Sequence, residues 1–360
     1  SSKRTRSTCA TSTCSRFVDN GRAYVDDYGM TRSRILGTGH YVPERVVTNH
    51  DLSQLMETTD EWIQERTGIR ERHWVEPGQT GAELAENAAR QALEAAGLEP
   101  KELDLVIYAT LSPDHDFPGT GVFLQKRLGL AGNAVLDIRQ QCTGFIYGTS
   151  IADQFIRTGT FRHVLVVGCE VHSTGLDVTT RGRDITVIFG DGAGAVVLGP
   201  SDSADRGLLA SCLHADGNFA EMLWCDKPGS MYQPRISAED IAEGRHFGHM
   251  QGRHVFKHAV TRMPEAVHEV LGAAKLSITD VDLFIPHQAN LRITEGVQKQ
   301  LGLPAERVFS NIQRYGNTTA ASIPIALDEC VRGGRVPEGS LVCMAAFGAG
   351  FTWGALLHRF

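Results

Sequence analysis

The chain has 360 residues, of which 42% are hydrophobic and 21% charged, values typical of a globular protein with one large or two medium-sized domains. Its formal net charge of −7 argues against a nucleic-acid-binding protein that works through overall positive charge. No apolar run approaches the roughly 18 residues of a membrane-spanning helix, no secretory signal is visible, and the eight cysteines include no CxxC pair. We therefore expect a cytoplasmic protein with no metal, and with neither nucleic acid nor membrane as a partner.

The first 29 residues differ in composition from the rest of the chain. They begin SSKRTRSTCATSTCSRF, which is rich in Ser, Thr and Arg and contains no acidic residue. We expect residues 1–29 to be a leader or an added tail, poorly ordered, ahead of a natural start at Met30. A remnant of an organelle transit peptide is the alternative.

Strand and helix patterns alternate from Met30 onward. Residues 82–96 (AELAENAARQALEAA) repeat their apolar positions at helical spacing and are followed by Gly97, a typical helix end. Short apolar runs predict strands at residues 34–37, 104–110, 161–168 and 193–198. Helices separated by apolar strands indicate a layered α/β fold.

The order of predicted elements occurs twice. DLVIYATLSPDH is followed by a helix that ends at Leu130, the strand VLDI, and a helix that begins near Cys142. DLFIPHQANLR is followed by a helix that ends at Leu303, the segment VFSNI, and a helix that begins near Asn317. This repeat predicts two duplicated halves, residues 30–203 and 204–360, in which Cys142 and Asn317 occupy nearly equivalent places.

Cys142 lies in IRQQCTGFIYG, where a predicted strand ends and a helix begins. The positive end of a helix dipole and its free N–H groups favour thiolate over thiol. A thiolate can attack a thioester carbonyl, and the same N–H groups can stabilise the oxyanion that forms. The residue pattern alone leaves open that Cys142 is a packed structural cysteine.

Two further side chains lie at positions typical of α/β active sites. His287 directly follows the apolar strand LFIP, and strand ends are where sites form in such folds. Asn317 follows a glycine at the start of a helix, where asparagine is more often an ordinary N-cap. Each residue by itself fits a structural role as well as a catalytic one.

Taken together, the motifs resemble β-ketoacyl-acyl-carrier-protein synthase III, the initiating condensing enzyme of type II fatty-acid synthesis. The resemblance runs from Met30 to Phe360 and rests on TDEWIQERTGIRER, the Cys142 segment, IFGDGAG, HQANLRI, GNTTAAS and AFGAGFTWG. It implies a thiolase-like fold in which the two halves form a layered αβαβα arrangement. It also implies an acyltransferase.

The resemblance implies a role for each central residue. Cys142 would take an acyl group from acyl-CoA, and His287 and Asn317 would bind malonyl-acyl-carrier-protein and stabilise the enolate that forms as carbon dioxide leaves. The N–H groups of Cys142 and Ala349 would form the oxyanion hole, and Phe347 would shield the thioester from water. The products would be 3-oxoacyl-acyl-carrier-protein, carbon dioxide and CoA, with no cofactor, because acyl-CoA and the malonyl carrier are both substrates.

The expected CoA contacts lie in several segments. Trp62 would stack on the adenine, and Arg181 would flank the base or a phosphate, with Arg66 near the same mouth. Gly252 would lie near the pantetheine arm, and Asn290 would brace the histidine or touch that arm. Two departures from the family pattern bear on CoA binding: Arg253 replaces an amide residue, and the segment 181–189 is two residues longer than the common form.

The resemblance also implies two protein partners. Lys257, Arg292 and Lys299 would form a basic patch that docks the acidic acyl carrier protein. The chain would form a homodimer in which Phe117 reaches across to cap the partner's acyl pocket. A large residue at that place favours a short starter such as acetyl.

Three other interpretations compete with this one. An acyltransferase of the same fold, or a condensing enzyme of specialised metabolism, could join the acyl group to a different acceptor. A papain-like cysteine protease also has Cys, His and Asn in this chain order, but it would be expected to carry a secretion signal and disulfides. A non-catalytic scaffold would be expected to lack one of the three site residues, and none is missing.

Overall fold

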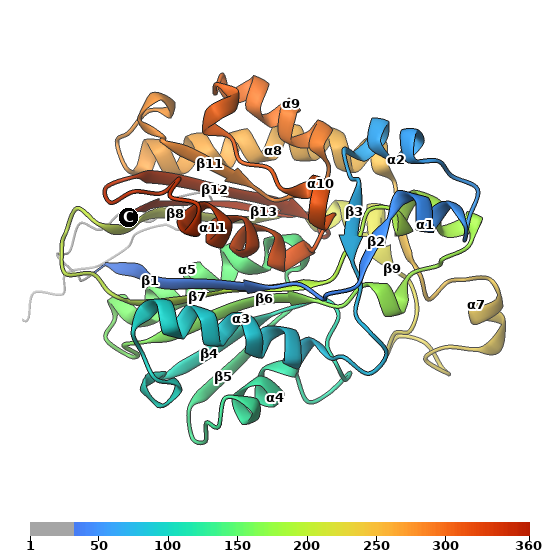
Figure 1. Cartoon of the computed structure of the whole chain (residues 1–360), viewed down its shortest axis with the longest axis horizontal. Coiled ribbons are helices and arrows are strands. Elements are labelled where there is room, and N and C mark those ends of the chain that lie inside the picture. Colours follow the sequence, from blue (N-terminus) through green and yellow to red (C-terminus); the bar gives the residue numbers. More distant parts are fainter. Residues whose placement is uncertain (1–31) are drawn as a thin grey trace, which may run out of the picture.

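The computed structural model describes residues 32–360, so the predicted tail of residues 1–29 lies outside it. A five-stranded mixed sheet is built from the first half of these residues, with strand order β1-β7-β6-β4-β5 (Figure 1). Its strands are β1 (Ser33–Tyr41), β4 (Leu105–Ala109), β5 (Ala134–Ile138), β6 (Val164–Glu170) and β7 (Gly192–Pro200). β4, β5 and β6 run parallel to one another, and β7 is antiparallel to both β6 and β1.

A four-stranded sheet in the second half has the order β11-β12-β13-β8. Its strands are β8 (Gly207–Ala215), β11 (Leu283–Pro286), β12 (Leu341–Gly348) and β13 (Thr352–Arg359). β11 and β12 are parallel, and the other pairs are antiparallel. Val308 adds an isolated parallel bridge to Phe284 on the outer side of β11, which is the place that β5 takes beside β4 in the first sheet.

The two sheets therefore repeat one topology. β1, β4, β6 and β7 correspond in neighbours and direction to β8, β11, β12 and β13. The strands divide between the sheets at the polar segment 201–206. The predicted duplication thus appears in the strand order, while the domain boundary at residue 203 stays a prediction.

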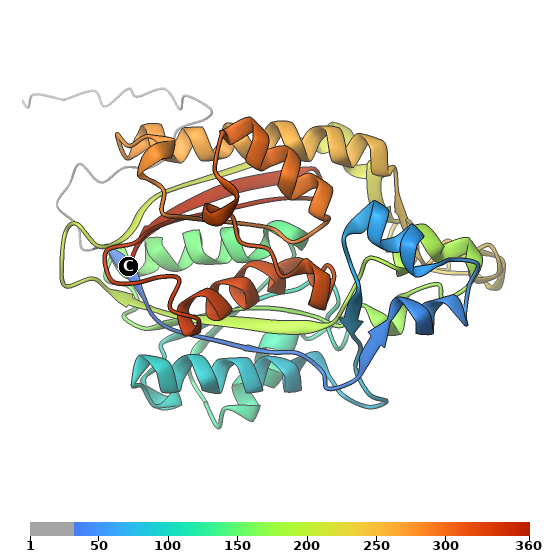
Figure 2. The ribbon, with the colours of Figure 1, turned by 45° about the horizontal axis from the view of Figure 1, so that its top comes forward.

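Helices form three layers around the sheets, as Figures 1 and 2 show. α3 (Gly81–Ala96) and α4 (Thr120–Arg127) cover the outer face of the first sheet, and α8 (Gly252–Ala273) and α9 (Leu291–Leu301) cover the outer face of the second. α5 (Gly144–Arg157) and α11 (Ser322–Arg332) are packed between the sheets, where their apolar side chains share one core with both. The αβαβα arrangement expected from the resemblance is confirmed.

Local sequence explains how closely α3 lies on its sheet. Thr80 caps the helix by accepting a hydrogen bond from the Glu83 N–H, and Gly97 ends it in the left-handed conformation. Gly37 in β1 lies directly beneath, since a Cβ atom added there would lie 2.3 Å from the Ala92 carbonyl oxygen. Alanines on the buried stripe of α3 and glycine on β1 thus allow backbone-to-backbone packing.

Smaller elements gather at one end of the layers (Figure 1). They are α1 (Asn49–Ser53), α2 (Asp60–Thr67), α6 (Arg183–Thr186), α7 (Ala238–Ala242), α10 (Ile312–Tyr315), β2 (Val46–Thr48), β3 (Glu71–His73), β9 (Leu223–Cys225) and β10 (Gly248–Met250). Within residues 32–360, no helix is both long and apolar enough to cross a membrane.

Candidate active site

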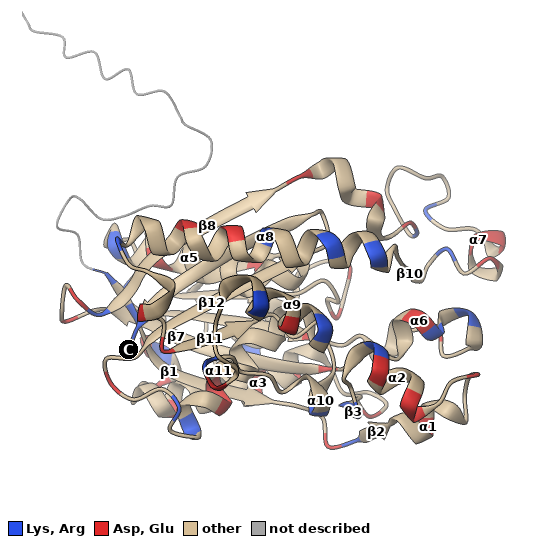
Figure 3. Cartoon of the chain, turned by 90° about the horizontal axis from the view of Figure 1, so that it is seen from above, with Lys and Arg blue, Asp and Glu red and all other residues tan. Residues whose placement is uncertain are grey.

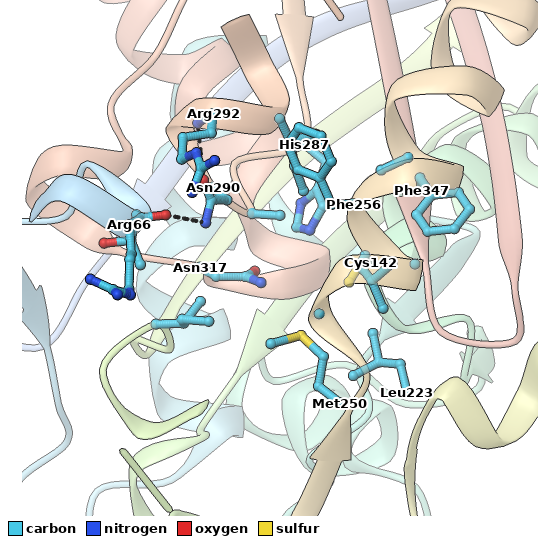
Figure 4. Close-up of a pocket in the computed structure, with 18 of the residues that line it drawn as sticks. Arg66, Cys142, Leu223, Met250, Phe256, His287, Asn290, Arg292, Asn317 and Phe347 are labelled. Carbon is cyan, nitrogen blue, oxygen red and sulfur yellow. Dashed lines mark hydrogen bonds between the residues drawn. The ribbon is translucent and has the colours of Figure 1, made fainter. Parts of the chain in front are cut away.

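A cavity of about 580 Å³ runs from this end of the molecule into the space between the two halves. Cys142, His287, Asn317 and Phe347 line its inner part, and Trp62 lines its mouth. Other predicted residues in its wall are Arg66, Gly252, Asn290 and Arg292, together with Arg253. Figure 4 shows the Cys142 sulfur, the His287 ring and the Asn317 amide directed toward a common space.

Cys142 lies in the 3-10 turn η2 (Gln141–Thr143), which leads directly into α5. The turn is tight, since Gln141 adopts a left-handed backbone with φ of 45°. Gly348 at the end of β12 lies against it, because a Cβ atom at that position would lie 2.6 Å from the Cys142 Cβ and 3.1 Å from the sulfur. A glycine from the second half thus makes room for the Cys142 side chain of the first.

The protonation state of Cys142 differs from the expectation. Burial raises the pKa of the thiol to about 12, and the negative charge of Glu170 acts in the same direction. Hydrogen bonds from the N–H groups of Ala349 and of Cys142 itself lower that pKa but do not outweigh burial. The prediction of a thiolate at neutral pH was therefore wrong for the unliganded chain, whereas the two predicted N–H groups do converge on the sulfur.

His287 follows β11 and is almost fully buried, with 2% of its surface exposed. Its Nδ1 lies 2.6 Å from the Ser322 hydroxyl, while its Nε2 has no hydrogen-bond partner among the described residues. Burial lowers the pKa of the imidazole to about 3, so the ring is neutral at physiological pH. A buried ring nitrogen without a partner at a cavity wall is suited to a hydrogen bond with a ligand.

Asn317 is held so that its amide group has one orientation. Its Oδ1 accepts a hydrogen bond of 2.8 Å from the Thr319 N–H, and its own backbone N–H and C=O bond to the Ile188 C=O and the Gly190 N–H. With Oδ1 engaged, the NH₂ group is the part left for the cavity. Asn317 therefore offers a donor to a bound ligand.

The predicted equivalence of Cys142 and Asn317 is only approximate. The second-half counterpart of η2 is the 3-10 turn η8 (Thr319–Ala321), which also begins with a left-handed residue and leads directly into a helix, α11. In that alignment Cys142 corresponds to Ala320, and Asn317 lies three residues earlier. The two turns contact each other, so the repeat brings the residues together without making them true equivalents.

One of the predicted CoA-binding arginines lies outside the cavity wall. Trp62 lies between two guanidinium groups, with Arg66 at 4.4 Å and Arg183 at 4.5 Å from its ring centroid. Arg181 instead donates to Asp177 at 2.5 Å and lies over Phe247, outside the cavity wall. Arg183, two residues further along the lengthened segment, is the arginine of that segment that lies over Trp62, and the CoA contact of Arg181 stays a prediction.

Asn290 has a different role from the one expected next to His287. Its Oδ1 caps α9 by accepting from the Arg292 N–H, and its Nδ2 donates to the Arg66 carbonyl at 2.9 Å (Figure 4). The bond to the His287 ring comes from Ser322. Asn290 thus joins the start of α9 to α2 at the mouth. Of the two predicted roles, bracing the histidine was wrong, and contact with the pantetheine arm stays a prediction, since Asn290 lines the cavity.

The remaining predicted residues lie around or away from the cavity. Lys257 and Lys299 are exposed on α8 and α9 and stay outside the cavity wall, while Arg292 lies at its rim. Basic residues occur along these two helices and on α2 and α6, as Figure 3 shows. Phe117 is 83% exposed on a loop of the first half and does not line the cavity of its own chain.

Comparison with known proteins agrees with this geometry. The family models for 3-oxoacyl-[acyl-carrier-protein] synthase III and for its C-terminal part match residues 136–217 and 271–360. The β-ketoacyl-[acyl-carrier-protein] synthase III of Thioalkalivibrio sulfidiphilus is 47% identical over 92% of this chain and 100% of its own length. The chain belongs to the β-ketoacyl-[acyl-carrier-protein] synthase III family. The predicted family and the predicted enzyme class, a condensing acyltransferase, are confirmed.

Solved structures of synthase III enzymes have the same fold as this chain. The crystal structure of 3-oxoacyl-[acyl-carrier-protein] synthase III from Aquifex aeolicus VF5 superposes with a TM-score of 0.84 at 44% identity, over 91% of this chain and 100% of that one. The priming β-ketosynthase from the R1128 polyketide pathway gives 0.84 at 39% identity, over 92% and 97%. The thiolase-like fold expected from the sequence is confirmed.

Three residues of this synthase III site escaped sequence reasoning. Gly348 acts through its missing side chain, and Ser322 through a contact between β11 and α11 that only the fold creates. Arg183 could have been found by counting back from IFGDG rather than by matching the RG pair. Counting back from IFGDG leaves the two extra residues on the N-terminal side of the matched position, so the count reaches Arg183 instead of Arg181.

Proposed function

We propose that this synthase III catalyses the decarboxylative condensation of a short acyl-CoA with malonyl-acyl-carrier-protein. Cys142 is the acyl-carrying nucleophile, and His287 and Asn317 activate the malonyl group. The observation that carries the proposal is one cavity lined by a buried thiol, an imidazole nitrogen without a partner and a carboxamide NH₂.

In the first half-reaction the Cys142 sulfur attacks the thioester carbonyl of acyl-CoA. The N–H groups of Cys142 and Ala349 hold the developing oxyanion. Because the thiol pKa is raised to about 12, the sulfur gives up its proton as it attacks, and His287 Nε2 is the base in reach of the same space. The bond from carbonyl carbon to CoA sulfur breaks, and that proton leaves with CoA as its thiol.

In the second half-reaction the malonyl thioester carbonyl accepts hydrogen bonds from His287 and Asn317. The carbon–carbon bond to the carboxylate breaks and carbon dioxide leaves. The electron pair of that bond stays on the thioester fragment as an enolate, which the two donors stabilise. The enolate carbon attacks the acyl group on Cys142, the carbon–sulfur bond to the enzyme breaks, and the released thiolate takes up a proton from solvent. A neutral His287 suits this step, because a neutral ring donates without carrying a buried charge.

Ser322 supports both uses of His287. The hydroxyl accepts a bond from the Gln288 N–H at 3.3 Å and can either accept a proton from Nδ1 or donate one to it. When Nδ1–H donates, Nε2 is free to act as a base. When the hydroxyl donates, Nε2 carries the hydrogen that the enolate needs.

The mouth of the cavity supports recognition of CoA and of a carrier protein. Trp62 offers a flat aromatic surface for adenine, and Arg183 and Arg66 supply the cations beside it. Gly252, Arg253 and Asn290 line the wall that a pantetheine arm would follow. Lys257, Arg292 and Lys299 on α8 and α9 are the proposed docking patch for the acidic acyl carrier protein.

We also propose a homodimer and a cytoplasmic location. Among residues 32–360, no strand pairs with the outer edge of β5, and the exposed Phe117 lies in the loop before α4 in the same half. Pairing of two such edges would cover both features and let Phe117 close the partner's acyl pocket, which favours a short starter. The six cysteines within residues 32–360 are all unpaired, in keeping with a reducing compartment.

Intact-protein mass spectrometry with a panel of acyl-CoAs tests the nucleophile and names the starter. The wild type should gain the mass of one acyl group, most completely with acetyl or another short chain. Cys142→Ala should gain none, whereas Cys343→Ala, which alters a buried cysteine of β12, should behave like the wild type. Acylation of Cys142→Ala would refute the assignment.

The similarity to a polyketide priming enzyme favours one alternative within the same chemistry. The acceptor could be the carrier protein of a specialised pathway rather than of fatty-acid synthesis. Competition between malonyl groups on the two kinds of carrier, with kcat/KM as the readout, would separate the alternatives.

A further inference from the structure

Three alternate residues at the carboxyl end of β6 and just beyond it face the η8 turn of the opposite half. They are Gly168, Glu170 and His172, which we call the β6 cradle. Residues two apart on an extended segment point to the same side, so one face of the first half meets the segment that follows Asn317. All three are buried.

Each member of the β6 cradle makes a different contact with η8. A Cβ atom at Gly168 would lie 2.1 Å from the Ala320 carbonyl oxygen, so glycine is needed for the approach. The Glu170 carboxylate accepts a hydrogen bond from the Ala320 N–H. His172 Nε2 lies 2.7 Å from the Thr319 hydroxyl.

Thr319 links these contacts to the site. It is a β-branched residue with φ of 48°, a backbone conformation that is strained for such residues and persists only where their surroundings hold it. In that conformation its N–H reaches the Asn317 Oδ1 at 2.8 Å. The backbone of Thr319 therefore determines which end of the Asn317 amide faces the cavity.

We propose that the β6 cradle positions Asn317: His172 holds the Thr319 hydroxyl, the held turn directs the Thr319 N–H at Asn317 Oδ1, and the Asn317 NH₂ is thereby aimed at the malonyl carbonyl. The inference rests on the proposed function. Without the contact, the Asn317 amide can rotate and present its oxygen to the enolate, which would repel it. His172 is a positioning residue and touches no reacting atom.

Loss of this positioning should separate the two half-reactions. Acylation uses the Cys142 sulfur, the N–H of Ala349 and, as the proposed base, His287. The His287 ring is bonded to Ser322, so none of these groups depends on the orientation of the Asn317 amide. Decarboxylation depends on it directly. A general loss of folding would weaken both half-reactions together.

The test compares His172→Phe, Thr319→Val and Thr319→Ser with the wild type. His172→Phe keeps an aromatic ring against Phe189, which lies 4.7 Å away centroid to centroid, and removes the hydrogen bond. Thr319→Val keeps the shape and removes the hydroxyl, while Thr319→Ser retains it. Ser150→Ala is the control, since Ser150 Oγ bonds Ser211 Oγ at 3.0 Å and also joins the two halves, away from the cavity.

Acyl-enzyme formation is followed by intact mass, and decarboxylation by release of labelled carbon dioxide from malonyl-carrier. We expect His172→Phe and Thr319→Val to acylate within about threefold of the wild type and to release carbon dioxide at least about tenfold more slowly. Thr319→Ser and Ser150→Ala should match the wild type in both.

Two results would overturn the inference. One is normal carbon dioxide release by Thr319→Val. The other is a loss of both half-reactions that is as large in Thr319→Ser as in Thr319→Val. Because Thr319→Ser keeps the hydroxyl, that result would show that the hydroxyl is not the cause, and it would do so even if His172→Phe did not fold. A wild type that forms the acyl-enzyme but never decarboxylates malonyl-carrier would instead refute the proposed function.

Discussion

The η2 and η8 turns follow the same backbone course, yet their surroundings differ. The second residue of η2 is Cys142, whose side chain packs against Gly348 and whose sulfur accepts hydrogen bonds from two backbone N–H groups. η8 carries Ala320 at that position, and its contacts instead fix Asn317, three residues earlier. The surroundings of η2 leave space around the Cys142 side chain, whereas the contacts of η8 fix the orientation of the Asn317 amide.

In the proposed mechanism, the two halves of this duplicated fold divide the chemical steps between them. The first half supplies Cys142, the proposed nucleophile, and the second half supplies His287 and Asn317, which line the same cavity. Each half also supports the other, since Gly348 makes room for Cys142 and His172 bonds Thr319. The two half-reactions should therefore respond separately to substitutions around each turn.

The largest effect is expected from Gly348→Ala, which tests the room around η2. The added Cβ would lie 2.6 Å from the Cys142 Cβ, closer than such atoms pack. We expect acyl-enzyme formation to slow by roughly 100-fold, since a displacement of about 1 Å costs that much. The measurement is the rate of mass gain with acetyl-CoA.

Gly272→Ala provides the matched control for Gly348→Ala, because a Cβ at Gly272 would meet no atom within 4 Å. It should acylate at the wild-type rate. If Gly348→Ala acylated as fast as the control, the close approach of the two halves would have no bearing on the nucleophile.

A smaller effect is expected at the cavity mouth, where Arg183→Ala and Arg181→Ala are compared. Arg183 lies over Trp62, and Arg181 is bound to Asp177 outside the cavity wall. We expect Arg183→Ala to raise the KM for acyl-CoA by roughly tenfold, in line with one partly buried cation–π contact of about 1–2 kcal/mol. Arg181→Ala should change this KM less than threefold, and the opposite ranking would restore the original assignment.

The smallest effect concerns Glu170→Gln and the pH dependence of Cys142. The carboxylate raises the thiol pKa, and its own pKa is raised to about 7 by burial, so the repulsion grows as pH rises through 7. Removing the charge should lower the Cys142 pKa and increase the thiolate fraction above pH 7. Alkylation of Cys142 by iodoacetamide at pH 8 should then be several-fold faster.

Glu94→Gln, which alters an exposed residue on the outer helix α3, serves as the control for Glu170→Gln and should leave alkylation unchanged. Because burial is the larger cause of the raised pKa, most of the elevation should remain in Glu170→Gln. A slower alkylation in that variant would contradict the assigned direction.

Much of the architecture could be predicted from the sequence. The helix 82–96, the strands and the repeat follow from local periodicity, and the family motifs identify Cys142, His287 and Asn317. The structure gathers these three in one cavity, but the spacing in the sequence did not reveal that Ala320 is the counterpart of Cys142. Local sequence patterns do not show which residue of one turn corresponds in space to a residue of the other.

The missed features depend on contacts between distant segments. The helix-start argument for a thiolate did not include burial, which dominates the pKa of Cys142. Ser322, Gly348 and His172 act on residues of other elements, and no neighbour in the sequence signals those contacts. Such partners become visible only when the two halves are assembled.

Parallel measurement of the two half-reactions in Asn317→Ala tests most directly whether the steps are divided between the halves. We expect Asn317→Ala to form the acyl-enzyme at a rate within about threefold of the wild type, while carbon dioxide release from malonyl-carrier falls by roughly 100-fold or more. Loss of acylation to the same degree as decarboxylation would contradict this expectation.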